Sequence, residues 1–138
     1  MKLNTSLGSN SITLPEFGAI EPERVIAQDA LWVVITDKYP VSSGHTLIIP
    51  RRPVALFSNL NSEEATGLMD WVSWVQKHWN ETLTAVPDAY NLGVNDGKAA
   101  GQTMSQFHFH VIPRYIGDVG DPRGGVRWVI PQKAKYWK

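Results

Sequence analysis

Residues 106–112 read Gln-Phe-His-Phe-His-Val-Ile, so polar and apolar side chains alternate strictly over the first five positions. Successive side chains of a β-strand point to opposite faces of a sheet. The two phenylalanines therefore share a face that is typical of a core, and the other face carries Gln106, His108 and His110. The pattern predicts a strand over residues 106–114 that presents two neighbouring imidazoles away from the core.

The rest of the chain predicts several short strands separated by turn-forming segments. Branched and aromatic residues mark the strands, and clusters of Pro, Ser and Gly mark the loops. Besides residues 106–114, strands are expected at residues 24–28, 31–36, 45–50 and 90–95, with loops at 38–44 and 96–105. We expect the strands at 31–36 and 45–50 to pair, because only a short loop joins them.

One long helix is expected after the third strand. Asn61 is a good N-cap, and Glu63 and Glu64 follow in the first turn, where the positive end of the helix dipole favours acids. Apolar residues then recur at spacings of three and four from Leu68 to Leu83, which is typical of a helix that packs on a core. One helix among hairpin-connected strands predicts an α+β fold with a mainly antiparallel sheet of about five strands.

Composition limits the chemistry that is available. The 138 residues suit one domain, and 13 basic against 13 acidic residues argue against a nucleic-acid or membrane-surface binder, which normally carries a basic excess. The absence of Cys excludes disulfides, thiolate metal ligands and thiol nucleophiles. Residues 1–20 lack the apolar core of a signal peptide and no segment is apolar enough to span a membrane, so a cytoplasmic protein is expected.

Two imidazoles at positions i and i+2 leave three interpretations open. They can be structural histidines, as is expected for His78 at the edge of the helix stripe. They can bind a metal, because H-x-H on a strand presents two nitrogens to one ion, but no Cys, Asp or Glu follows closely as a third ligand. They can act in catalysis, because an ordinary imidazole pKa of about 6.5 suits a nucleophile or proton shuttle at neutral pH.

The loop before the last strand favours catalysis. Its Gly and Ala residues allow backbone amides to approach a ligand, and Asn95, Gln102 and Thr103 offer donors suited to phosphate oxygens. It is not a Walker A loop, because the span from Gly93 to Lys98 is one residue short and no Ser or Thr follows the lysine.

Three segments in this order resemble the histidine triad (HIT) family. The segment Asp37-x-Tyr-Pro-Val-Ser-x-Gly-His45-Thr-Leu-Ile-Ile-Pro is similar to the family's D-x-x-P-x-x-x-G-H-x-L-φ-I-P, where φ is apolar. The loop looks like the family's N-D/E-G…G-Q-T/S stretch, and residues 106–112 match His-φ-His-φ-His-φ-φ at six of seven positions. The resemblance covers about residues 24–115 and implies a single HIT-like domain over residues 1–138.

The resemblance implies a role for each matching residue. His108 matches the middle His, which attacks the α-phosphorus of a nucleotide and forms a nucleotidyl-histidine intermediate. His110 matches the third His, which contacts the phosphate, and His45 matches a further His that supports the same network. Asp37 matches a carboxylate that binds ribose hydroxyls. Polar groups around the phosphate and leaving group are matched by Asn95, Gln102 and Thr103.

The chain departs from the family pattern at Gln106, which stands at the place of the first triad His. In the family, the backbone carbonyl here orients the catalytic imidazole, and Gln keeps that carbonyl but cannot relay a proton. The resemblance implies a nucleotide hydrolase that acts on dinucleoside polyphosphates or phosphoramidates. A nucleotidyl transferase and a nucleotide-binding protein without turnover are the alternatives.

Expected partners follow from the same resemblance. The chain lacks the N-terminal Cys pair that often binds zinc in relatives, so no bound metal and no cofactor are expected, and a divalent ion would arrive only with the nucleotide. Family members are commonly homodimers, and the apolar tail with Trp128, Tyr136 and Trp137 would suit an intersubunit contact if it is exposed. Neither nucleic acid nor a membrane is an expected partner.

Overall fold

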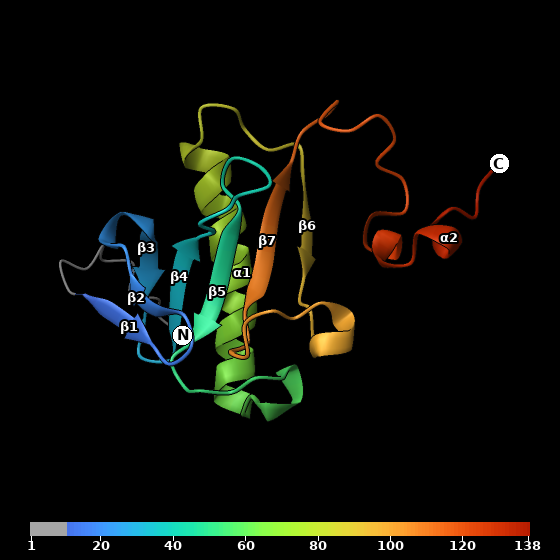
Figure 1. Ribbon diagram of the computed structural model, residues 1–138. Coiled ribbons are helices and arrows are strands. Elements are labelled where there is room, and N and C mark those ends of the chain that lie inside the picture. The colour runs from blue at the N-terminus through green and yellow to red at the C-terminus, as the bar shows by residue number, and fades with distance from the viewer. Residues whose placement is uncertain (1–10) are drawn as a thin grey trace.

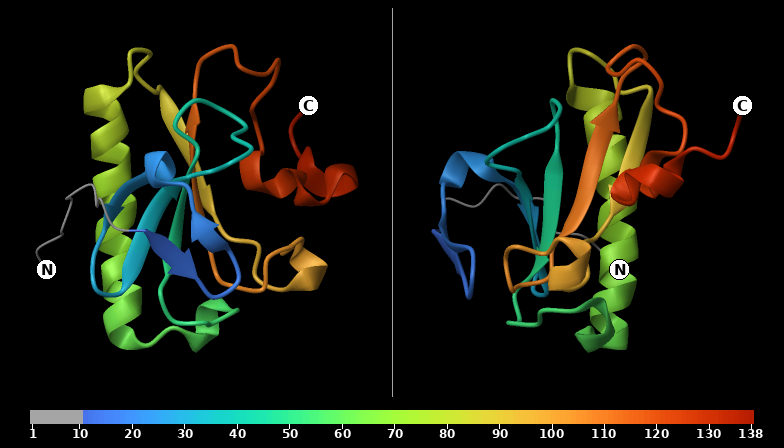
Figure 2. Two further views of the ribbon diagram at one scale, coloured as in Figure 1. Left: turned by 60° about the vertical axis from the view of Figure 1, so that its left-hand side comes forward. Right: turned by 45° about the vertical axis from the view of Figure 1, so that its right-hand side comes forward.

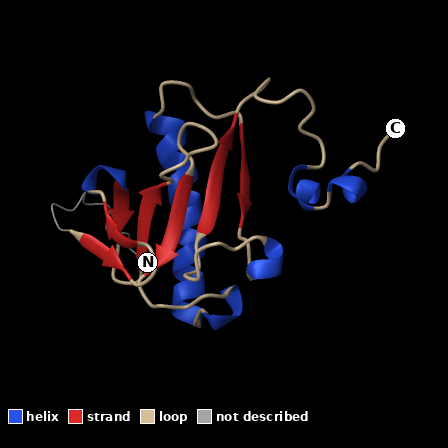
Figure 3. Ribbon diagram, in the orientation of Figure 1, coloured by secondary structure: helices blue, strands red, loops and turns tan. Residues whose placement is uncertain are grey.

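The computed structural model describes residues 11–138, which form a hairpin, a sheet and a helix in three layers (Figures 1 and 2). Residues 1–10, which belong to the segment considered as a signal peptide, lie outside the described residues. The sheet has the antiparallel spatial order β3-β4-β5-β7-β6, and α1 (Ser62–Thr82) covers one of its faces (Figure 3). The predicted α+β fold, with a five-stranded antiparallel sheet and one long helix, is confirmed. The sheet strands are β3 (Val25–Gln28), β4 (Trp32–Thr36), β5 (Thr46–Pro50), β6 (Ala89–Gly93) and β7 (Phe109–Arg114).

The predicted pairing of the second and third strands is confirmed, since β4 and β5 pair from Trp32 opposite Pro50 to Thr36 opposite Thr46. The last strand begins later than predicted. Its ladder with β5 starts at Phe109, whereas the backbone N–H of Phe107 donates to the Val54 carbonyl, beyond the end of β5. Residues 106–108 are therefore held by contacts outside the ladder, and β7 covers residues 109–114.

Both faces of the central strands are buried. On one face, Val34 and Ile48 pack with Trp71 and the other buried side chains of α1. On the opposite face, Val33 and Leu47 pack against a second hairpin. Two apolar clusters on either side of β4 and β5 explain why these strands read as continuous apolar runs rather than alternating ones.

That hairpin was not predicted. It consists of β1 (Ile12–Leu14) and β2 (Gly18–Ile20), in a stretch that was considered only for a signal peptide. Leu14 pairs with Gly18 across a three-residue turn, and Gly18 has a φ of +71°, which glycine adopts without steric cost. The apolar side of the hairpin rests on the sheet face opposite α1.

The helix start agrees with the prediction. The Asn61 side chain accepts from the Glu64 N–H at 2.8 Å, and the Glu64 carboxylate accepts from the Asn61 N–H at 2.9 Å, which forms a capping box. Glu64 is buried and also binds the Arg52 guanidinium. His78 lies on α1 and stacks on Trp74, with ring centroids 4.7 Å apart.

The remaining helical elements are short. Figure 1 shows the C-terminal segment beyond β6, at that edge of the sheet. Among residues 11–138 no helix has the length and apolarity needed to cross a membrane. The short elements are the 3₁₀ turns Pro22–Arg24, Phe57–Asn59, Lys98–Ala100 and Gly125–Val129, and α2 (Pro131–Ala134).

Candidate active site

Three of the four histidines gather on the sheet face opposite α1. His110 lies on β7 directly across from Leu47 of β5, and Leu47 belongs to the apolar cluster under the β1–β2 hairpin. Residues directly opposite one another in adjacent strands project to the same face. The imidazoles therefore stand beside the hairpin. The alternation in the sequence predicts their shared face but not the hairpin that packs there.

The His108 ring is oriented by the backbone of Gln106. Its Nδ1 lies 2.9 Å from the Gln106 carbonyl oxygen. A carbonyl oxygen can only accept, so Nδ1 carries the hydrogen and Nε2 keeps its lone pair in the neutral ring. The ring is buried, at 8 % exposure, and is thus held with a basic nitrogen opposite its anchoring bond.

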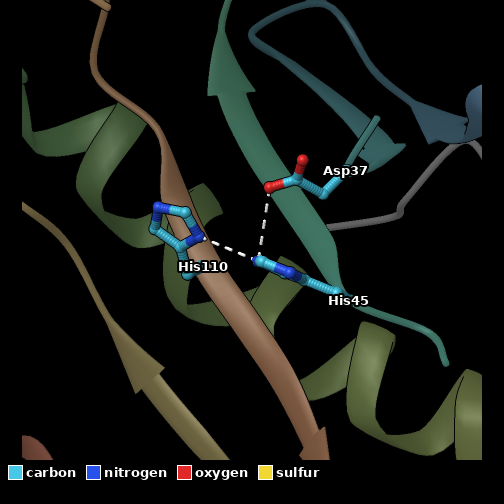
Figure 4. A group of neighbouring side chains, drawn as sticks. All are labelled: Asp37, His45 and His110. Carbon is cyan, nitrogen blue, oxygen red and sulfur yellow. Dashed lines mark hydrogen bonds and ion pairs between the residues drawn. The ribbon is translucent and has the colours of Figure 1, made fainter. Parts of the chain in front are cut away.

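His110 takes the opposite tautomer, through His45 (Figure 4). The backbone N–H of Val41 donates to His45 Nδ1 at 3.1 Å, so neutral His45 carries its hydrogen on Nε2. That Nε2 lies 2.9 Å from His110 Nδ1, which must accept the bond. The hydrogen of neutral His110 is therefore on its Nε2. Within residues 11–138 this nitrogen has no hydrogen-bond partner, so it can donate to a ligand.

Two adjacent imidazoles thus present different chemistry. The ring centroids of His108 and His110 are 5.2 Å apart. One ring offers a lone pair for attack on an electrophile, and the other offers a neutral N–H donor that can stabilise charge developing on that electrophile.

Asp37 completes this cluster. Its Oδ2 lies 3.4 Å from His45 Nε2, and its Oδ1 accepts from the backbone N–H of Tyr39 at 2.8 Å. Burial lowers the pKa of His45, an effect that the Asp37 carboxylate partly opposes. Burial also lowers the pKa of His110 to about 4, helped by repulsion from His108 and His45. Both rings are therefore neutral at pH 7, as the tautomer assignment requires.

Asp37, His45 and His110 could also hold a metal ion, since one donor atom from each lies within 4.8 Å of the others. In the part of the chain that the structure describes, they form the only such group. In the sequence, no Cys, Asp or Glu follows His108 and His110 closely as a third ligand. The structure supplies Asp37 and His45 from distant segments and leaves His108 out. Because His45 and His110 already hydrogen-bond each other, a cation would have to displace that shared hydrogen.

Acid should destabilise the fold through His110. The unfolded imidazole, with an ordinary pKa near 6.5, binds a proton as the pH falls below that value, whereas folded His110 does so only near pH 4. The free energy of unfolding therefore falls with falling pH across this window. Between pH 7 and pH 5, the free energy of unfolding of His110→Asn should fall by about 1–2 kcal/mol less than that of wild type, as measured by urea unfolding. Equal losses in both proteins would contradict the assignment.

The predicted phosphate-binding residues of the β6–β7 loop make other contacts than those of this cluster. The Gln102 Oε1 accepts from the Gly97 N–H within the loop at 2.8 Å. Its Nε2 donates at 3.0 Å to the carbonyl of Ala55, in the segment between β5 and α1. Asn95 and Thr103 are exposed. Within residues 11–138, none of these three side chains hydrogen-bonds to an imidazole. Of the predicted site residues, the structure brings together Asp37, His45, Gln106, His108 and His110.

Two contacts to the imidazoles were missed from the sequence. The Phe17 ring meets the His108 ring edge-on, with centroids 5.2 Å apart, and the Val41 N–H sets the tautomer of His45. The first had a signal in the sequence, since Ile12, Leu14 and Ile20 flank Phe17 as apolar residues in an otherwise polar stretch. The second involves only the backbone and leaves no signal in the side chains.

A groove of about 600 Å³ continues the site along β7. It begins at Ile112, which shares the face of His110 because side chains repeat every second residue, and it includes Arg114. Gly125, Val126 and Trp128 of the C-terminal segment form part of its wall. The volume falls in the range of sites for small organic ligands. The imidazoles do not line the groove, which starts one position farther along the same face of β7.

Comparison with known proteins places this arrangement in a family. The HIT domain model matches residues 19–117. The chain is 33% identical over 114 residues to the adenosine 5'-monophosphoramidase of Schizosaccharomyces pombe, covering 80% of this chain and 79% of that protein. It is 38% identical over 82 residues to the bis(5'-nucleosyl)-tetraphosphatase [asymmetrical] of the same organism, covering 59% of this chain and 44% of that protein.

The fold agrees with a solved structure as well. The crystal structure of the C. elegans NitFhit protein superimposes with a TM-score of 0.74 at 26% identity, over 94% of this chain and 30% of that one. The residues that the HIT domain model matches include the H-x-H strand, the loop before it and the segment that carries Asp37 and His45. The chain therefore belongs to the HIT family.

Proposed function

We propose that this protein is a nucleotide hydrolase that cleaves nucleoside monophosphate derivatives at the α-phosphate through a covalent intermediate on His108. The observation that carries the proposal is the pair of opposed tautomers on β7 and just before it. His108 presents an unprotonated Nε2, while neighbouring His110 presents a neutral N–H donor. A phosphoryl group needs both, one for attack and one for its charged oxygens.

In the first step, the Nε2 lone pair of His108 attacks the α-phosphorus. The N–P bond forms as the bond from phosphorus to the leaving oxygen or nitrogen breaks, and the leaving group departs with the electron pair. The Gln106 carbonyl holds the hydrogen on His108 Nδ1 and stabilises the positive charge that the ring acquires. His110 Nε2–H donates to a non-bridging phosphate oxygen.

In the second step, water attacks the same phosphorus and the N–P bond breaks. The electron pair returns to Nε2, a water proton is released to solvent, and the nucleoside monophosphate leaves. Two displacements on one imidazole replace a single attack by water, which is the weaker nucleophile. His45 and Asp37 keep His110 in its donor tautomer in both steps. We also propose that the Asp37 carboxylate binds the ribose hydroxyls of the substrate.

The substrate class is taken from the relatives. One is named as an adenosine 5'-monophosphoramidase and another as a bis(5'-nucleosyl)-tetraphosphatase, so phosphoramidates and dinucleoside polyphosphates are the substrates to examine first. The groove beyond Ile112 could receive the leaving part of such a substrate. We propose that Asn95, Gln102 and Thr103 approach the phosphates through the β6–β7 loop once a nucleotide is bound.

The deciding experiment is release of nucleoside monophosphate by the purified protein. Adenosine phosphoramidate, diadenosine triphosphate and diadenosine tetraphosphate would be supplied separately, with and without Mg²⁺, and AMP quantified by chromatography. We expect AMP from at least one substrate. We also expect turnover of the phosphoramidate to persist in chelator, because no residue-bound metal takes part. Nucleotide binding without any AMP release would instead identify a non-catalytic binding protein.

A transferase is the other alternative, and the same assay separates it. If the intermediate passes its nucleotidyl group to a second phosphate-bearing acceptor faster than to water, added phosphate or nucleotide gives a new mixed product at the expense of AMP. We propose that water is the favoured acceptor of the nucleotidyl group. Transfer to a phosphate or nucleotide would require a second binding pocket for that acceptor, whereas hydrolysis requires none.

We further propose a homodimer in the cytoplasm. Trp128 and Tyr136 of the C-terminal segment are exposed, at 45% and 76%, together with neighbouring Val129 and Ile130. Apolar side chains gathered in this way are typical of a surface that another protein covers. A second copy of this chain is the partner that family resemblance favours.

A further inference from the structure

The tip of the β1–β2 hairpin lies against the imidazole that we propose as the nucleophile. The planes of the Phe17 and His108 rings meet at 86°, so the two rings are in edge-to-face contact. Phe17 is half-buried and belongs to the apolar cluster under the hairpin. Its ring occupies space beside the imidazole and so restricts rotation of His108 about its side-chain bonds.

A side chain from the segment just before β7 also hydrogen-bonds to this hairpin tip. Gln106 is fully buried, and its Oε1 accepts from the Glu16 backbone N–H at 3.2 Å. Its Nε2 donates to the carbonyl of Pro50, the last residue of β5, at 2.6 Å. The backbone carbonyl of the same glutamine accepts from His108. Gln106 therefore links the hairpin, the end of β5 and the proposed nucleophile.

A neutral amide is suited to this position because it supplies one acceptor and donors in a site without water access. A carboxylate would place only acceptors opposite the Pro50 carbonyl. A neutral imidazole would supply one donor and one acceptor, but protonation would turn the acceptor that faces the Glu16 N–H into a second donor. Glutamine makes both bonds at every pH at which the protein is folded.

We propose that Gln106 is a positioning residue, whose buried amide holds the β1–β2 hairpin so that Phe17 keeps the His108 imidazole in its reactive orientation. The kinetic consequences rest on the proposed function. The orientation and tautomer of the His108 ring can be tested whether or not the proposed function is correct.

Four variants test this proposal. Gln106→Leu keeps the size of the side chain and removes its donor and acceptor, and Gln106→His keeps one of each but can titrate. Phe17→Ala removes the ring and leaves the Gln106 bonds in place, so it serves also if Gln106→Leu does not fold. Leu68→Ala removes buried volume from α1 on the opposite face of the sheet and controls for lost stability alone.

The first measurement is ¹⁵N NMR of the imidazoles at pH 7.5, which needs no turnover. We expect wild type and Leu68→Ala to show His108 with a protonated Nδ1 and an unprotonated Nε2. Gln106→Leu and Phe17→Ala should show shifts averaged between the two tautomers. A His108 spectrum in both variants identical to that of wild type would overturn the proposal, even if both lose thermal stability.

The second measurement is steady-state kinetics. A misplaced nucleophile should lower kcat by about 10–100-fold in Gln106→Leu and Phe17→Ala, with KM changed by less than about twofold. The double variant should be no slower than the worse single variant, because both changes release the same ring. Gln106→His should approach wild type at pH 8 and fall behind it towards pH 6. Fully multiplied losses in the double variant would overturn the proposal, whereas an inactive wild type would overturn only the proposed function.

Discussion

His108→Ala is expected to lower the rate of nucleoside monophosphate release by roughly four orders of magnitude. The proposed reaction passes through a bond to His108 Nε2, and no neighbouring group can replace that nitrogen. His110 carries a hydrogen on its Nε2, and its Nδ1 is engaged by His45. The measurement is kcat with the best substrate of the wild-type protein. An undiminished rate would show that His108 is not the nucleophile.

His78→Ala is the matched control for this variant. It removes an imidazole of the same kind from α1, where His78 stacks on Trp74 and contacts no residue of the proposed site. We expect kcat within about twofold of wild type, since changes remote from a site seldom alter its geometry. A comparable loss in both variants would indicate a general effect of losing a histidine rather than loss of the nucleophile.

The intermediate itself can be captured. A phosphorus–nitrogen bond to imidazole survives alkali and is cleaved by acid, so a substrate labelled in its nucleoside should leave label on wild-type protein after an alkaline quench. The label should be absent from His108→Ala and released from wild type at low pH. Label that is retained in His108→Ala would assign the covalent bond to another residue.

Local periodicity accounts for what could be predicted of this fold. The stripe from Leu68 to Leu83 and the cap at Asn61 are properties of neighbouring residues, so helix and cap could be recognised without knowledge of the rest. The β1–β2 hairpin has strands of three residues each, and its stability comes from burial against Val33 and Leu47. Isolated short hairpins are marginal in water, so the local pattern was too weak to predict one.

The site shows the same limit. Alternation placed His108 and His110 on one face, because that property belongs to a single strand. The partners that define their chemistry lie far along the chain. The two shorter side-chain bonds of Gln106 reach Glu16 and Pro50, which are 90 and 56 residues away. Sequence analysis could assign Gln106 a backbone role but not a buried amide contact.

The resemblance contributed residues that periodicity could not. His45 was singled out only because it matches a family position, and the structure places its Nε2 beside His110, 65 residues along the chain. Gln102 was singled out both for its amide donors and for its motif position, yet its amide binds Gly97 in the same loop and Ala55, 47 residues earlier in the chain. A motif thus identifies which residues matter, while the hydrogen bonds show how each one acts.

The fold that supports this site should depend heavily on Trp71. Its side chain is fully buried between α1 and the sheet, and its indole N–H donates to Asp29 Oδ2 at 2.9 Å. Trp71→Ala should lower the free energy of unfolding by about 3–5 kcal/mol, because a large cavity and an unpaired acceptor remain. Domains of this size are stable by only about 5–15 kcal/mol, so the variant should unfold at much lower urea concentration.

Two variants separate the causes of this loss. Trp71→Phe keeps most of the buried volume and removes only the bond to Asp29, so its cost should be about 1–2 kcal/mol. Trp74→Ala makes the same truncation three residues later on α1, where the indole is only half-buried, and should cost less than Trp71→Ala. If Trp74→Ala costs as much, the stability lies in the stacked aromatic residues of the helix surface. If Trp71→Ala is the more costly, the stability comes from the helix–sheet core, which keeps β5 and β7 in register and so holds His45 beside His110.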